Sequence, residues 1–368
     1  MAVTKATKLS VPWLEDLPDP TGRAVLVRAT LDRPLSGDPA EPLATHRAGC
    51  LAATVGWLLG HGARVTVCGD LDGGSEQQEQ TLATVQAMLR PTAARLRQVI
   101  AVRAVSEDEA SVAELVAGHD LFVNDTLQDS LLPLPSLTVP PRRLPSAAGR
   151  SLQHDLEALE CLAEPPRPFV AVLGGDDRTA RLRGLEGLIL RADTVLLGGA
   201  LARPVLQAIG ELAAATPTAP LLKECRAVVG LSRRIRHGLV LPIDLVWESQ
   251  DGSTLVTDAL GTEGGRVVDI GPRTRVRFAE AIEGSRTVLW AGALGRVEEP
   301  AWAAGSLAVA AALRNEPTTV LGGDALVRVL HGAGRLPPSA AVLSATDAAI
   351  EWLKNGDLPA LAALRTGA

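Results

Sequence analysis

The feature that most constrains the fold is an alternation of short apolar runs with helical patterns along the whole chain. Most of the runs are continuous Val, Leu and Ile stretches, which are typical of parallel strands covered on both faces. A helical pattern, clearest over Thr45–His61, separates successive runs. Repeated this often, the alternation predicts an α/β fold with doubly wound parallel sheets. The predicted strands are Ala24–Leu31, Ala63–Gly69, Asp120–Asp125, Phe169–Gly175, Asp193–Gly199, Leu239–Trp247, Thr287–Gly292, Thr318–Gly323 and Ala340–Ala345.

The length of the chain, 368 residues, suits two hydrophobic cores better than one. The stretch Pro145–Ala163 has the pattern of a long amphipathic helix, and the segment EPPRP follows it at 164–168. We therefore predict an N-terminal α/β domain over 1–144, an interdomain hinge helix over 145–163 and a C-terminal α/β domain over 164–343. We expect the last segment, 344–368, to pack back on the first domain.

Charge and composition exclude several classes of partner. The formal net charge is −6, with acids and bases interspersed, so we expect no nucleic-acid partner. No apolar run approaches the roughly 20 residues of a membrane span, and the first residues lack the apolar core of a signal peptide. The four cysteines lie far apart, which is typical of free thiols in a reducing compartment. We expect a cytoplasmic monomer that binds a small molecule and has no membrane partner.

Paired glycines end three of the predicted strands in the second half of the chain. These pairs close the segments VLGG at 172–175, VLLGG at 195–199 and VLGG at 320–323. In open α/β sheets the ligand crevice lies beyond the carboxyl ends of the strands, where glycine allows close approach of the backbone. A tight turn explains any one pair equally well, but three pairs favour an ancestral nucleotide site. The candidate cofactor-binding residues are Gly174, Gly175, Gly198, Gly199, Gly322 and Gly323.

A set of collinear motifs resembles the phosphoglycerate kinases over nearly the whole chain. The motifs include RAVLVRATLDRPL at 23–35, FVNDTLQDS at 122–130, RPFVAVLGG at 167–175, VLWAGALGRVEE at 288–299 and IEWLKNGDLPALAAL at 350–364. The resemblance implies a hinge-bending enzyme with a cleft between its domains. The N-terminal domain would bind an acidic three-carbon phosphate through a basic patch, and the C-terminal domain would bind MgATP. Catalysis of this kind is mostly positioning and neutralisation of the transferred phosphoryl group.

Several positions that the resemblance assigns to the acidic substrate have changed. The substrate-binding Asp and Asn of the family correspond to Thr30 and Asp32. The family segment SHLGRP, which supplies a His and an Arg, corresponds to 69–74, where Asp70 stands. Two arginines, Arg47 and less closely Arg103, match the basic patch and remain candidate substrate-binding residues. The resemblance thus implies that this domain has gained carboxylates and lost cations.

The nucleotide half shows similar changes. The family segment GGAKVSDK corresponds to 174–181, so Asp177 replaces the first lysine and Arg181 the second. Because no lysine lies between Lys8 and Lys223, a shifted alignment restores none. Two acids persist: Glu298 matches a nucleotide-ribose Glu, and Asp324 matches a metal-ligating Asp.

These substitutions predict that phosphorylation of 3-phosphoglycerate is absent or very weak, because a charge reversed near a phosphate costs several kcal/mol. One hypothesis is carboxylate acid/base chemistry in the cleft on a neutral or cationic small molecule, with candidate catalytic residues Thr30, Asp32, Asp70, Asp177 and Arg181. A second is an ATP-dependent phosphotransferase acting on another carboxylate or hydroxyl, and a third is a catalytically inactive binding protein. No cofactor is required by the first hypothesis, and ADP or ATP with magnesium would bind only weakly. Any single one of these aspartates is more often an exposed surface carboxylate.

Overall fold

The structure is a computed structural model, and it describes residues 10–32, 35–70, 79, 83–85, 87, 96–101, 108–175, 179–212, 219–235, 238–258, 265–313 and 318–367. The chain forms two compact units. The first unit contains Lys5–Leu159 together with Gly356–Ala368, and the second contains Glu160–Asn355. The boundary therefore falls inside one helix, α5 (Arg150–Ala163). Each unit is an α/β structure with its own parallel sheet, as the alternating sequence pattern predicts.

The first unit is built on a parallel sheet with the order β3-β2-β1-β4-β5. Strand β1 lies at its centre, and the chain leaves it first toward β2 and later toward β4. In doubly wound sheets the point where the strand order reverses is where side chains beyond the carboxyl ends of the strands can gather. The strands are β1 (Ala24–Ala29), β2 (Arg64–Gly69), β3 (Leu96–Ala101), β4 (Leu121–Asp125) and β5 (Ser146–Ala148).

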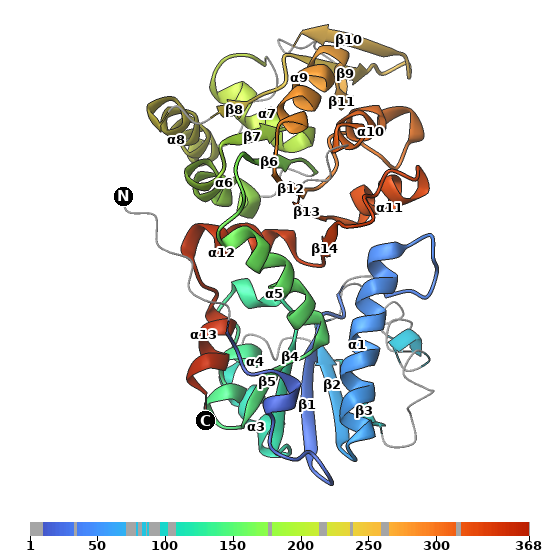
Figure 1. The fold of residues 1–368 in the computed structure, drawn as a ribbon, viewed down its shortest axis with the longest axis vertical. Coiled ribbons are helices and arrows are strands. Elements are labelled where there is room, and N and C mark those ends of the chain that lie inside the picture. The colour runs from blue at the N-terminus through green and yellow to red at the C-terminus, as the bar shows by residue number, and fades with distance from the viewer. Residues whose placement is uncertain are drawn as a thin grey trace. The chain divides into compact units, whose positions relative to one another are not determined.

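Alternate residues of β1 point to opposite faces of this sheet. Val25 and Val27 pack with the buried leucines of α1 (Pro42–Gly60), whereas Leu26 packs in a second cluster on the other face. That second cluster includes residues from the elements α3, α4 and α13. Figure 1 shows α1 and α13 on opposite sides of the strands of this unit. The further elements are η1 (Leu14–Asp16), α3 (Glu109–Ala117), η3 (Gln128–Leu131), α4 (Pro135–Thr138), η4 (Pro140–Arg142) and α13 (Pro359–Thr366).

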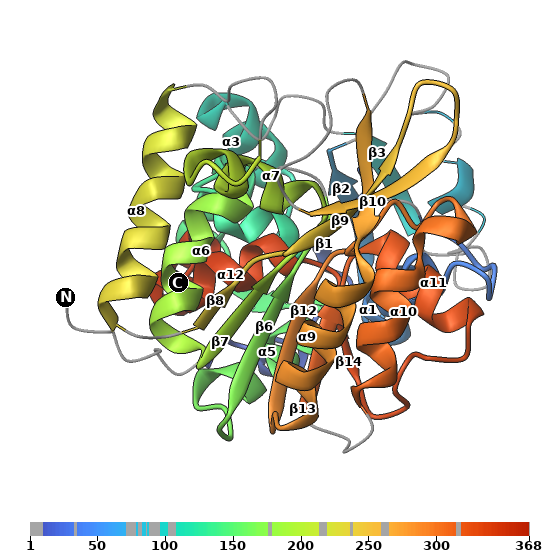
Figure 2. The same cartoon turned by 90° about the horizontal axis from the view of Figure 1, so that it is seen from above.

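The second unit contains a six-stranded parallel sheet with the order β14-β13-β12-β6-β7-β8. Its two central strands, β12 and β6, are buried along their whole length, which explains their continuous apolar sequence. The helix α10 packs against α9 and α11, and Figure 2 shows these three helices grouped on one side of the sheet. The strands are β6 (Phe169–Leu173), β7 (Thr194–Leu197), β8 (Gly238–Val240), β12 (Thr287–Ala291), β13 (Thr318–Gly322) and β14 (Ala341–Leu343). The helical elements are α6 (Thr179–Arg191), α7 (Gly199–Ala208), α8 (Ala219–Ile235), α9 (Pro272–Glu283), η5 (Pro300–Trp302), α10 (Ala304–Ala311), α11 (Asp324–Gly332) and α12 (Thr346–Asn355).

Two glycines allow α6 to lie directly against α12 in the second unit. A Cβ atom on Gly184 would meet Cγ2 of Ile350 at 2.2 Å, and one on Gly187 would meet the Cα of Lys354 at 2.6 Å. Separations this short are not tolerated in a packed interior. The absence of side chains at these two positions is therefore what permits the close helix–helix contact.

A small antiparallel sheet with the order β10-β9-β11 completes the second unit. Its strands are β9 (Asp244–Glu248), β10 (Thr254–Asp258) and β11 (Arg266–Ile270). The single strand predicted over Leu239–Trp247 was wrong, because β8 ends at Val240 and β9 belongs to this other sheet. The chain changes sheet at Leu241–Ile243, and Pro242 supplies no backbone N–H for a continuous ladder.

The predicted hinge helix over 145–163 begins later than expected. Residues Ser146–Ala148 form β5, where Ala148 pairs with Asn124 of β4, and α5 starts at Arg150. The last segment, predicted over 344–368, divides between the units. The helix α12 packs against α6 in the second unit, whereas α13 packs against α4, η3, η4 and β5 in the first.

Candidate functional site

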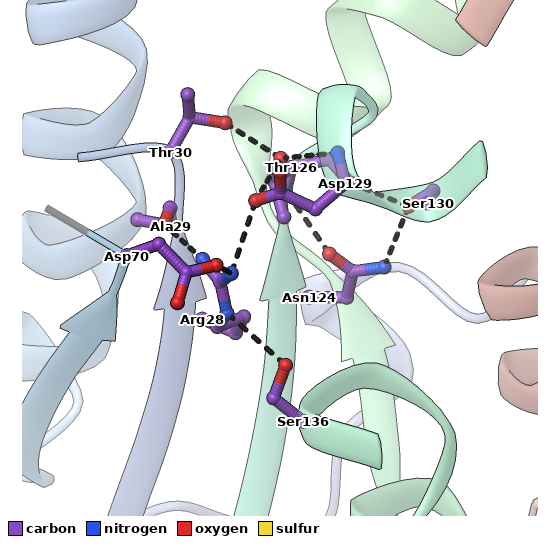
Figure 3. Close-up of polar contacts among 9 residues, drawn as sticks. All are labelled: Arg28, Ala29, Thr30, Asp70, Asn124, Thr126, Asp129, Ser130 and Ser136. Carbon is purple, nitrogen blue, oxygen red and sulfur yellow. Dashed lines mark hydrogen bonds and ion pairs between the residues drawn. The ribbon is translucent and has the colours of Figure 1, made fainter. Parts of the chain in front are cut away.

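A polar network lies at the carboxyl end of the first sheet, at the point where the strand order reverses. Thr30 directly follows β1, Asp70 directly follows β2, and Thr126 and Asp129 follow β4. Because β2, β1 and β4 are parallel neighbours, their carboxyl ends meet at one edge of the sheet. Figure 3 shows Asp70 and Asp129 beside Arg28, the penultimate residue of β1, and Thr126 joining Asp129 to Thr30.

Arg28 is the cation of this network, and its side chain is 1% exposed. Its Nη2 lies 2.5 Å from Oδ2 of Asp70 and 3.1 Å from Oδ2 of Asp129. Its Nη1 donates to the carbonyl of Ala29 at 2.6 Å, and its Nε donates to Oγ of Ser136 at 3.4 Å. A buried charge is tolerated only when it is paired and hydrogen-bonded, and both conditions hold for this guanidinium.

Hydrogen bonds through the Thr126 hydroxyl connect Asp129 to Thr30. The hydroxyl of Thr126 lies 3.4 Å from Oδ2 of Asp129 and 2.6 Å from the hydroxyl of Thr30. Burial raises the pKa of Asp129 above its usual value, while Arg28 opposes this effect and Asp32 and Asp70 reinforce it. In this network the hydroxyl of Thr126 therefore lies between the half-buried Thr30 and a carboxyl group whose pKa is raised.

Asn124 and Ser130 hold the loop that carries Thr126 and Asp129. Oδ1 of Asn124 accepts from the amide of Thr126 at 3.0 Å, and Nδ2 of Asn124 lies 3.3 Å from Oγ of Ser130. The Ser130 hydroxyl donates to the carbonyl of Thr126 at 2.6 Å. All three residues are buried, so these bonds fix the loop rather than contact solvent.

The structure places the sequence-predicted residues of the first unit as follows. Thr30 and Asp70 belong to the network, and Asp32 is half-buried and acts on Asp129 through its charge. Arg47 is buried on α1. Arg103 lies outside the described residues. Sequence reasoning missed Arg28 and Asp129, although both lie inside the motifs at 23–35 and 122–130.

The paired glycines of the second unit are packed tightly against the protein's own backbone. The amides of Gly174 and Gly175 donate to the carbonyls of Ala291 and Ala293 at 2.9 and 2.6 Å. A Cβ atom on Gly174 would lie 2.2 Å from the Ala293 carbonyl oxygen. Gly199 has a φ of +59° and its amide donates to the carbonyl of Leu294 at 3.1 Å. The tight-turn explanation therefore accounts for these glycines without a ligand.

The remaining candidate residues of the second unit lie as follows. The amide of Gly198 donates to the carbonyl of Leu173 at 2.8 Å, and a Cβ atom on Gly322 would meet the Leu343 carbonyl oxygen at 2.5 Å. Gly323, with a φ of +111°, precedes α11, and the half-buried Asp324 begins that helix. Glu298 is exposed. Arg181 lies in α6, and Asp177 lies outside the described residues.

A second polar cluster joins α1 and α5 in the first unit. His46 of α1 and His154 of α5 have ring centroids 4.2 Å apart, and their nearest nitrogens are 3.3 Å apart. The Cys50 thiol lies 3.5 Å from Nε2 of His46, and burial raises its pKa to about 12. The sequence periodicity alone gave no signal that these two histidines, 108 residues apart, would meet.

Within the described ranges, no group of three or more His, Cys, Asp or Glu side chains is arranged to hold a metal ion. No helix in the same ranges combines the length and apolar character needed to cross a membrane.

The family of the chain follows from comparison with known proteins. A family model described as "Phosphoglycerate kinase" matches residues 102–355. The phosphoglycerate kinase of Azorhizobium caulinodans is 30% identical over 380 residues, which cover 99% of this chain and 92% of that protein. The chain belongs to the phosphoglycerate kinase family. The phosphoglycerate kinase of Salinispora arenicola is 29% identical, with 97% of this chain and 100% of that protein covered.

Solved structures of phosphoglycerate kinases confirm the fold. The enzyme from Pyrococcus horikoshii matches with a TM-score of 0.76 at 20% identity, over 96% of this chain and 98% of that one. The enzyme from Coxiella burnetii matches with a TM-score of 0.74 at 22% identity, over 96% and 99%. The sequence-based prediction of the family and of its two-unit α/β fold is thus confirmed.

Family membership implies ADP or ATP with magnesium, and the described residues fit these groups only in part. The amides of Gly174, Gly175, Gly198 and Gly199 already donate to backbone carbonyls, so they do not form a cradle for phosphate oxygens. Asp324 offers carboxylate oxygens of the kind that magnesium prefers, but it also puts negative charge in the first turn of α11. The glycine-ended strands therefore do not fit a tightly bound triphosphate.

Proposed function

We propose that this member of the phosphoglycerate kinase family is not an efficient phosphoglycerate kinase. We propose instead that the carboxyl end of its first sheet acts by carboxylate acid/base chemistry on a neutral or cationic small molecule. The observation that carries the proposal is the pairing of Arg28 with two carboxylates, those of Asp70 and Asp129. A phosphate or carboxylate ligand placed at this guanidinium would lie close to two like charges, which disfavours it.

The proposed acid/base residue is Asp129. Burial raises the pKa of Asp129, because the charged carboxylate loses its hydration inside the protein. The protonated form of Asp129 therefore persists to higher pH than it does in a solvated aspartate. The Thr126 hydroxyl lies between Asp129 and Thr30, so a proton can pass along these hydroxyls to a ligand at Thr30. Arg28 holds Asp129 in place and limits the rise of its pKa. The roles of Asp32 and Asp70 are to keep this edge of the sheet negative.

The first experiment is a coupled assay with MgATP and 3-phosphoglycerate. The proposal expects turnover far below the common enzyme range of roughly 1–10³ per second. Turnover inside that range would contradict it. A second experiment screens neutral and cationic small molecules by ligand-detected NMR, with phosphorylated acids as the comparison set. Wild-type protein should bind members of the first set in preference to the second, and T30V should weaken those hits more than T45V, a substitution in α1 outside the network.

A second candidate function is an ATP-dependent phosphotransferase that acts on another carboxylate or hydroxyl. It is favoured by the names of the relatives from Salinispora arenicola and Azorhizobium caulinodans, which are both called "Phosphoglycerate kinase" and are matched over nearly the whole of both chains. Retention of Asp324 and Glu298 at the positions given by the resemblance also supports it. Calorimetry distinguishes the two candidates. Tight ATP binding that requires magnesium and is lost in D324N would support the phosphotransferase, whereas equal binding of adenosine, ADP and ATP would oppose it.

A further inference from the structure

The two carboxylates on Arg28 differ in how firmly the protein holds them. The Asp129 side chain is 15% exposed, and its Oδ2 also lies 3.4 Å from the Thr126 hydroxyl. The Asp70 side chain is 34% exposed and stands at the end of β2, where it meets Nη2 of Arg28 at 2.5 Å. Asp129 is therefore part of the folded loop, whereas Asp70 occupies the more open side of the guanidinium.

The geometry of a guanidinium makes Nη2 of Arg28 the atom on which an incoming anion would compete with the two carboxylates. An anion is bound in a fork either by Nε together with one Nη or by the two Nη groups. On Arg28, Nη1 and Nε are directed at the Ala29 carbonyl and the Ser136 hydroxyl, and Nη2 is shared by the two carboxylates. An incoming anion therefore has to displace one of these acceptors, and the more exposed Asp70 is the one with the least other support.

We propose that Asp70 is a specificity-determining residue: its carboxylate takes the place of an anionic ligand on Arg28 and so excludes phosphates and carboxylates from this edge of the sheet. The inference deepens the proposed function and rests on its premise that the site does not take anions. It also accounts for the burial of a cation at this edge of the sheet, because Arg28 is paired with Asp70 and Asp129 within the protein. The ligand class excluded is any small molecule that carries a phosphate or a carboxylate at this position.

The test is the affinity of the full-length chain for inorganic phosphate, measured by calorimetry at low ionic strength. Wild-type protein and the control D38A, which removes an exposed aspartate of the same unit, should bind phosphate weakly. D70A should bind it about tenfold more tightly or better, because one like charge has been removed and Nη2 has been released. D70N, which keeps the shape and removes the charge, should lie between the two. In D70A, the NMR signal of an arginine Nε–H should shift as phosphate is added.

Three results would overturn the inference. D70A could bind phosphate no better than D38A, the wild type could already bind it as tightly as D70A, or D129N could gain affinity to the same extent as D70A. The last result would mean that Asp70 excludes phosphate from Arg28 no more effectively than Asp129 does. Thermal unfolding of each variant shows that the first unit is folded under the conditions used. The inference is tested by phosphate affinity, whereas the proposed function is tested by the kinase assay and the ligand screen. Failure of one can therefore be distinguished from failure of the other.

Discussion

Asp125 accepts two hydrogen bonds from Ser151, one from its amide at 2.8 Å and one from its hydroxyl at 3.1 Å. A side chain at the end of β4 is thereby joined to the first turn of α5. The Thr54 hydroxyl of α1 donates a third bond to the same carboxyl at 3.1 Å. A carboxylate at a helix N-terminus is favourable, but this one is fully enclosed, and its burial raises its pKa to about 7.

The first prediction concerns the pH dependence that Asp125 imposes. Its pKa is raised in the folded state, so its stabilising contribution is fully present below the unfolded pKa of 3.8 and is lost as the pH rises through about 7. The free energy of unfolding of the wild type relative to D125N should therefore fall between pH 4 and pH 7. Denaturant unfolding at a series of pH values measures the difference. D38N, at an exposed aspartate of the same unit, is the control substitution, and a flat difference for D125N would contradict the assignment.

The second prediction concerns the two histidines between α1 and α5. Burial, together with the nearby His154 and Arg47, lowers the pKa of His46, and Asp155 partly opposes the shift. The stabilising contribution of neutral His46 is thus present above the unfolded pKa of 6.5 and is lost as the pH falls through the folded value. NMR titration should show His46 titrating below 6.5, and H154Q should move its pKa upward. An unchanged His46 titration in H154Q would show that the close ring contact has no electrostatic effect.

The third prediction concerns Gly305 at the start of α10. Oδ2 of Asp269 accepts from the Gly305 amide at 2.7 Å, and a Cβ atom on this glycine would lie 2.2 Å from Oδ1 of the same carboxyl. G305A should therefore lower the free energy of unfolding by about 1–3 kcal/mol. The matched control is G230A in α8, where a Cβ atom meets nothing within 4 Å. That variant should gain about 0.5–1 kcal/mol from helix propensity, and equal effects of the two substitutions would refute the proposed contact.

The fourth prediction concerns the contact between α6 and α12. G184A should destabilise the second unit by about 1–3 kcal/mol, because its new methyl group overlaps Cγ2 of Ile350. I350A removes that atom and leaves the Ile350 Cβ at 3.4 Å, an ordinary contact distance. In the I350A background, G184A should therefore cost much less than in the wild type. A double-mutant cycle measures this coupling, and additive costs would mean that the two positions do not compete for the same space.

Most strands of the two parallel sheets could be predicted for a local reason, whereas β3 and β5 were not among the predicted strands. Strands buried on both faces carry continuous apolar runs, as in Phe169–Leu173, and each such run is visible without knowledge of its neighbours. The antiparallel strands β10 and β11 gave no comparable signal. Leu255 and Val256 of β10 are 46% and 51% exposed, and β11 begins with exposed and half-buried residues. Their pairing with β9 is fixed by tertiary contacts that periodicity does not report.

The candidate site was predictable only in part, and the reason is again physical. The sequence alone predicted that Thr30 and Asp70 lie at the ends of strands, and the resemblance implied that Asp70 stands in a segment where the family has a His and an Arg. Only the tertiary structure decided which groups meet, because strand order and loop paths bring together residues far apart in the chain. Arg28 contacts Asp70 and Ser136, which lie 42 and 108 residues further along. The sequence therefore specified which charged residues lie at this edge of the sheet, and the fold specified that one buried arginine would pair with two of the carboxyl groups.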